Sequence, residues 1–142
     1  MKMVVRMAVV VALSGLAACA RAPEERSLYQ RLGGEPAMAA VVDDFVANVA
    51  ANPAINQRFA RADIPKLKKL LGEQFCEATG GGCKYTGRSM RESHRGMNIT
   101  PAEFNAMGGD MLKTLEKFRV PPRERDELMA LLGSMNKEIV GQ

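Results

Sequence analysis

The spacing of apolar residues constrains the fold of this 142-residue chain more than any other feature. From Ser27 onward these residues recur at steps of three and four, the period of an α-helix with one buried face. Nowhere does the sequence show the apolar–polar alternation that indicates β-strands. The length suits one domain. We therefore predict an all-α fold with four substantial helices and short helical pieces between them.

Glycines and prolines divide this pattern into elements, because glycine ends helices and proline is favoured in their first turn. In the long second helix we expect Asp43, Asp44 and Asn48 to lie largely away from the apolar face. The predicted elements are a brief helix before Gly33-Gly34, a helix from Pro36 to Asn52, a turn around Ile55 and Phe59, a helix from Pro65 to Thr79, a short helix from Ser89 to Arg95, a helix from Pro101 to Phe118 that is capped by Thr100 and Glu103, and a last helix that reaches Ile139.

The first eighteen residues have the form of an export signal, with a positive start and an apolar run. They end in Leu16-Ala17-Ala18-Cys19, which resembles the processing site of bacterial lipoproteins. The resemblance implies a signal peptide over residues 1–18, a lipidated Cys19, a tether over 19–26 and a folded domain over 27–142. It implies a lipid-anchored protein of the cell envelope that faces the periplasm, and the non-acidic Ala20 favours the outer membrane. The alternative is an ordinary cleaved signal with an incidental cysteine.

Charge, histidine and cysteine content exclude several kinds of site. The formal charge of +4 is too small to demand a nucleic-acid partner, and a single histidine excludes any site that needs two imidazoles. Cys76 and Cys83 flank a glycine-rich loop, and in an oxidising compartment we expect them to form a disulfide. The competing interpretation makes these two thiols metal ligands together with His94.

The segment between Gly80 and Thr100 contains the most specific motif of the sequence. Tyr85-Thr86-Gly87 is followed by Met90, His94, Gly96 and Ile99, and Met90 and His94 share one face of a short helix. Together with the upstream motif Leu28-Tyr29-Gln30-Arg31-Leu32-Gly33-Gly34, this arrangement resembles the group I truncated haemoglobins, which have the two-over-two globin fold. The resemblance runs from Leu28 to Val140.

The resemblance implies one haem b per chain, held between the third helix and the short helix before Ile99. His94 matches the proximal ligand of the haem iron, and a neutral imidazole is a standard ligand there. Phe59 matches a phenylalanine that packs on the porphyrin. The remaining positions that match the lining of the haem are Leu67, Leu71 and Phe75 on the distal side and Met90 and Ile99 on the proximal side.

The chain departs from the family on the distal side. Many members have tyrosine after the phenylalanine that matches Phe45, and glutamine at the position of Leu71; these polar groups hydrogen-bond to O2. In this chain the distal pocket is lined by Phe45, Val46 and Leu71, and none of these side chains has a hydrogen-bond donor. We therefore expect a binder or transporter of O2, or of NO or CO, rather than an enzyme. The alternatives are a globin enzyme that detoxifies NO or reactive oxygen species with an external electron donor and, more weakly, a haem carrier.

Three lysines at the start of the third helix leave alternatives open. Lys66, Lys68 and Lys69 face solvent by default. Each could instead meet a haem propionate, and Lys68 or Lys69 could ligate the iron, although burying a deprotonated lysine is costly.

Overall fold

The structure is a computed structural model that describes residues 25–142. The predicted signal peptide, Cys19 and most of the tether lie outside the described residues. Within the described part the fold is all-α, as predicted, and the pairing of Ile99 with Val140 is an isolated bridge rather than a strand. The elements are α1 Leu28–Arg31, α2 Gly34–Ala51, the 3-10 helix η1 Asn56–Phe59, α3 Ile64–Ala78, α4 Met90–His94, α5 Pro101–Lys117, α6 Pro122–Ser134 and α7 Asn136–Ile139.

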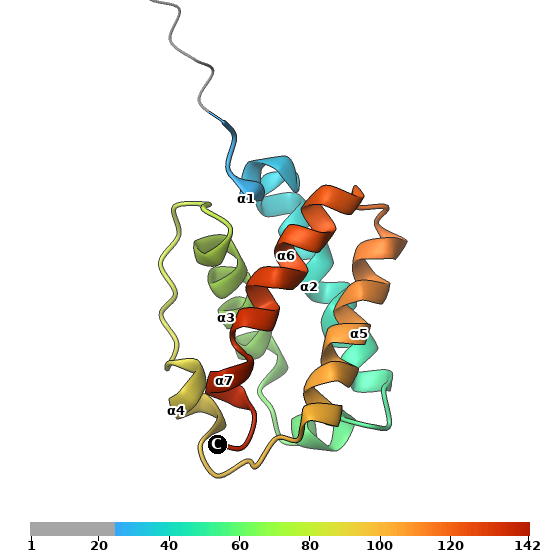
Figure 1. Cartoon of the computed structure of the whole chain (residues 1–142), viewed down its shortest axis with the longest axis vertical. Coiled ribbons are helices and arrows are strands. Elements are labelled where there is room, and N and C mark those ends of the chain that lie inside the picture. Colours follow the sequence, from blue (N-terminus) through green and yellow to red (C-terminus); the bar gives the residue numbers. More distant parts are fainter. Residues whose placement is uncertain (1–24) are drawn as a thin grey trace, which may run out of the picture.

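Two antiparallel helix pairs form the body of the molecule (Figure 1). One pair is α2 with α3 and the other is α5 with α6, and α2 packs against both α3 and α5. The short helices α4 and α7 pack together beside the C-terminus, at the end of the molecule away from α1. Among the helices within residues 25–142, none combines the length and hydropathy needed to cross a bilayer.

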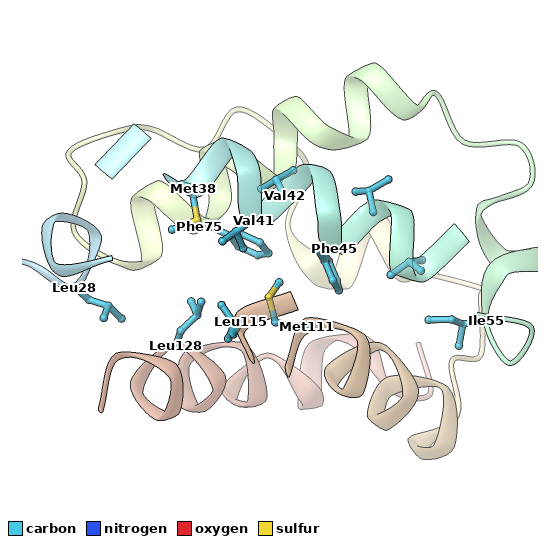
Figure 2. Packing of buried hydrophobic residues seen from close by; sticks show 12 residues of the cluster. Leu28, Met38, Val41, Val42, Phe45, Ile55, Phe75, Met111, Leu115 and Leu128 are labelled. Carbon is cyan, nitrogen blue, oxygen red and sulfur yellow. The ribbon is translucent and has the colours of Figure 1, made fainter. Parts of the chain in front are cut away.

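The main core lies between the two pairs, where the apolar face of α2 meets α5 and α6 (Figure 2). The rings of Phe45 and Phe75 contribute the aromatic part of this core, with centroids 6.4 Å apart. The buried residues of the cluster are Leu28, Met38, Val41, Val42, Phe45, Val46, Val49, Ile55, Phe75, Met111, Leu115 and Leu128. The apolar face that the sequence predicts for α2 is therefore correct.

The polar residues of α2 are placed differently from the prediction. Asp43 is exposed, but Asp44 and Asn48 turn toward α5 and contact the fully buried Thr114. The Thr114 hydroxyl donates to Asp44 Oδ2 at 3.0 Å, and Asn48 Nδ2 donates to Thr114 Oγ1 at 2.9 Å. Lys117 pairs with Asp44 from outside, and these contacts lower the pKa of the carboxyl group. Asp44, Asn48 and Thr114 therefore form a hydrogen-bonded network at the edge of the core, where the sequence suggests a solvated face.

The last helix of the prediction is two helices in the structure. Ser134 Oγ donates to the Leu131 carbonyl at 2.6 Å, the acceptor that the Met135 N–H would use in a continuing α-helix. The Met135 N–H donates instead to the Leu132 carbonyl at 3.1 Å, which tightens the turn. The chain therefore leaves α6 at Met135, and α7 packs on α4.

Candidate functional site

His94 lies at the end of α4, a helix of five residues with a well-formed N-terminus. The Ser89 hydroxyl accepts from the Glu92 N–H, while the Glu92 carboxylate accepts from the Ser89 N–H at 3.1 Å. This capping box lowers the pKa of Glu92. The chain then leaves the helix at Gly96, whose φ is +78°, a conformation that suits glycine. Local sequence thus limits α4 to the one turn that aligns Met90 with His94.

One hydrogen bond orients the His94 ring. His94 Nδ1 lies 2.7 Å from the Met90 carbonyl oxygen. A carbonyl can only accept, so Nδ1 is the protonated nitrogen and donates. In the neutral ring this arrangement leaves the lone pair on Nε2, which is the form of histidine that ligates a metal. His94 is half-buried, so this nitrogen is partly shielded from water.

The loop that leads into α4 is tied to the end of α3. A disulfide joins Cys76 to Cys83, whose Cα atoms are 5.7 Å apart. Gly81 passes so close that a Cβ there would lie 2.8 Å from the Tyr29 ring and collide with the Cys76 sulfur. Thr86 donates to Glu73 through its N–H at 3.1 Å and its hydroxyl at 2.6 Å.

Glu73 is also paired with Lys69. The Lys69 ammonium and the Thr86 donors together lower the pKa of Glu73 to about 2. Lys68 Nζ pairs with Asp43 at 2.8 Å, so both cations are held by carboxylates, while Lys66 is exposed.

A face of α3 presents Leu67, Leu71 and Gln74, which are spaced by four and three residues and are all half-buried. Gln74 Nε2 lies 3.1 Å from Met90 Sδ and 3.5 Å from Met135 Sδ. The amide therefore bridges α3 to the helix of His94 and to the α6–α7 turn. Sequence reasoning missed Gln74, because the spacing of apolar residues does not distinguish it from a solvated polar residue of α3.

The structure brings some of the predicted site residues together and separates others. His94 Nδ1 is hydrogen-bonded to the Met90 carbonyl. The main core contains Phe45, Val46 and Phe75, whose exposed fractions are 3%, 6% and 2%. Leu71 packs against that core from its partly buried edge.

Phe59 also packs against the main core, but at a different place, and Ile99 is not part of this core cluster. Phe59 borders a separate hollow of about 350 Å³ with Ile64 and Ala60, at the far end of α2. Ile99 is buried and pairs with Val140.

The donor set of this region fits haem. One imidazole has its Nδ1 bonded to a backbone carbonyl, which leaves Nε2 as the nitrogen that can ligate iron. Several large apolar side chains around α3 and α4 are only half-buried, including Leu67, Leu71, Met90 and Met135. Apolar walls with few polar groups are typical of cofactor sites. Within residues 25–142 no cluster of three or more histidine, cysteine or acidic residues could hold a bare metal ion.

Residues 27–140 match the model of the family described as bacterial-like globin. The chain belongs to this family. It is 31% identical to the group 1 truncated hemoglobin of Mycolicibacterium paratuberculosis over 119 residues, 84% of this chain and 88% of that one. It is 33% identical to the group 1 truncated hemoglobin of a Synechocystis species over 112 residues, 76% of this chain and 90% of the relative.

Solved structures agree with this globin assignment. Truncated hemoglobin from Tetrahymena pyriformis in its Fe(III) form superposes with a TM-score of 0.80 at 28% identity, covering 82% of this chain and all of the other. The 2/2 hemoglobin of a Synechococcus species gives 0.75 at 30% identity, covering 80% and 95%. The predicted two-over-two globin fold is confirmed, and membership of a globin family implies a haem.

Proposed function

We propose that this globin holds one haem b per chain through His94 Nε2 and binds a diatomic gas, O2 foremost. The observation that supports this most is the hydrogen bond from His94 Nδ1 to the Met90 carbonyl, because it leaves Nε2 as the ligating nitrogen. When bound, the haem supplies an iron with a further coordination position for a gas. The chain supplies the imidazole, its orientation and apolar walls that keep water away.

The distal residues argue for simple gas binding over oxygen chemistry. Val46 is 6% exposed and Phe45 3% exposed in the main core, and neither has a donor. Lys68 and Lys69 are engaged by Asp43 and Glu73. A charge-assisted hydrogen bond to a ligand is worth roughly 1.5–3 kcal/mol, and a pocket without donors gives O2 none of it. We therefore expect O2 to leave quickly, while CO, which develops little charge, is less affected.

Stopped-flow displacement of O2 and CO tests both the function and the pocket. A Val46→Tyr variant adds a hydroxyl donor, and one bond of about 1.4 kcal/mol should slow O2 release roughly tenfold. Release of CO should change much less. Val46→Phe is the matched control, because it adds the ring at this buried position without the hydroxyl.

The contrary result is that wild type already releases O2 slowly and that Val46→Tyr and Val46→Phe release it at the same rate as wild type. Another residue would then supply the donor. Gln74, the polar side chain next to Leu71 on the face of α3, is the first to replace, as Gln74→Leu.

We also propose that the globin domain is anchored at the cell envelope through a lipidated Cys19. The motif around Cys19 lies outside the described residues. The disulfide between Cys76 and Cys83 supports the proposal, because such bonds persist in oxidising compartments. Fractionation of cells should find wild type in the membranes and Cys19→Ser released or unprocessed. A wild-type protein that is wholly soluble and begins after Cys19 contradicts the anchor.

A further inference from the structure

The last three residues, Val140 to Gln142, lie alongside the segment that follows α4 (Figure 1). We call these three residues the C-terminal clasp. Val140 and Ile99 form a parallel bridge, and the Gly141 N–H donates to the Ile99 carbonyl at 2.9 Å. The Asn98 N–H donates to the Gln142 backbone oxygen at 2.8 Å. The clasp therefore fixes the chain four and five residues after His94.

The Gln142 side chain fixes the other side of His94. Arg91 Nη1, three residues before His94, donates to Gln142 Oε1 at 2.8 Å. Gln142 Nε2 donates to the Lys137 and Val140 carbonyls at 3.3 and 3.2 Å, which holds the amide against α7. One residue thus contacts the His94 segment on both sides, through a side-chain bond to Arg91 and a backbone bond to Asn98.

The backbone of this region needs such support. Asn98 has a φ of +48°, a left-handed conformation that asparagine adopts more readily than most residues other than glycine, and Gly141 has a φ of +72°. The two left-handed turns direct the segments toward each other. With five residues, α4 is too short to be stable as an isolated helix. Its position therefore depends on what contacts it, which includes α7, the clasp and, through Met90, the Gln74 amide of α3.

We propose that the C-terminal clasp is a positioning element for His94, which sets the direction of Nε2 by holding α4 in place. The imidazole is fixed to α4 through the Met90 carbonyl, so a rotation of α4 turns the ring with it. This inference rests on the proposed function, because its effect is seen at the bond between His94 and the haem iron.

The experiment uses the haem-loaded protein and four variants of the clasp. Truncation after Val140 removes Gly141 and Gln142, and Gly141→Pro keeps the length but removes the N–H and the positive φ. Gln142→Ala removes only the Arg91 contact and the amide bonds, whereas Gln142→Glu keeps an acceptor for Arg91. Lys137→Ala, an exposed side chain on α7, is the control.

Two readouts separate positioning from simple stability. The first is the iron–histidine stretching band in the resonance Raman spectrum of the ferrous protein, and the second is the rate of haem transfer to an apoglobin acceptor. Truncation and Gly141→Pro should shift or broaden the band and speed haem transfer by about tenfold or more, the usual effect of losing support for a metal ligand. Gln142→Ala should have a smaller effect, and Gln142→Glu, which keeps the acceptor for Arg91 but loses the two amide donations, should have no larger an effect than Gln142→Ala. Lys137→Ala should resemble wild type.

The inference is overturned if the truncated, Gly141→Pro and Gln142→Ala proteins keep the wild-type band and transfer rate, even when their melting temperatures fall. The clasp would then only stabilise the fold. A wild-type protein that takes up no haem contradicts the proposed function instead. If truncation prevents folding, Gln142→Ala and Gln142→Glu still decide the matter, because both keep the backbone bonds.

Discussion

At the scale of single residues, the sequence selects His94 as the candidate iron ligand, but it does not give the orientation of the imidazole ring. His94 is the chain's one histidine and lies in a motif that resembles one of the globins, and these two facts identify it as the candidate. The direction of Nδ1 toward the Met90 carbonyl depends on how α4 is capped and where it ends, which pattern alone does not give. Gln74 was missed for a related reason. Its neighbours Leu71 and Phe75 satisfy the apolar pattern, so nothing in the periodicity separates it from a solvated position.

Glu103 links three segments near the site. Arg58 Nε pairs with Glu103 Oε1 at 2.7 Å, and Arg58 Nη1 donates to the Met97 carbonyl at 2.9 Å. The second Glu103 oxygen accepts from the Thr100 N–H and hydroxyl, both at 2.9 Å. The Arg58 guanidinium, followed by the Thr100 donors, lowers the pKa of Glu103 from 4.5 to about 2.

We predict that this carboxylate makes the fold sensitive to acid. Because its pKa is lower in the folded than in the unfolded protein, its contribution to stability is present above about pH 4.5 and is lost as the pH falls toward 2. Thermal melts followed by circular dichroism should show a steeper fall in melting temperature over that window for wild type than for Glu103→Gln. The comparison also removes the part due to the other carboxylates, which both proteins share. Parallel curves would contradict the prediction.

At the scale of elements, most helix boundaries follow from local chemistry. The capping boxes at Ser89 and Thr100 begin α4 and α5 where the sequence predicts. The break at Met135 was not predictable from spacing, because the apolar period continues through it and only a hydrogen bond from the Ser134 hydroxyl interrupts the ladder. The C-terminal clasp could not be predicted either, since its partner segment lies some forty residues earlier and no motif marks the contact.

At the scale of the whole molecule, α2 contributes half of the buried residues of the apolar core. Toward α5 and α6 it forms the closed core that contains Phe45 and Phe75. The pattern of the sequence predicts which residues are apolar but cannot separate those that fill the core from those that line a cofactor. The predicted lining residues differ in exposure in the structure: Phe75 is 2% exposed, whereas Leu67, Leu71 and Met90 are only half-buried.

The proposed function requires that His94 holds a haem, and the most direct test is a haem titration of wild type and His94→Ala. Wild type should take up one haem per chain with a sharp Soret band, and its ferrous form should shift that band when CO is added. His94→Ala should retain haem poorly, because the described structure offers no second imidazole, and added imidazole should restore part of the binding. If His94→Ala binds one haem as tightly as wild type and gives the same ferrous spectrum, His94 is not the ligand and the account is wrong.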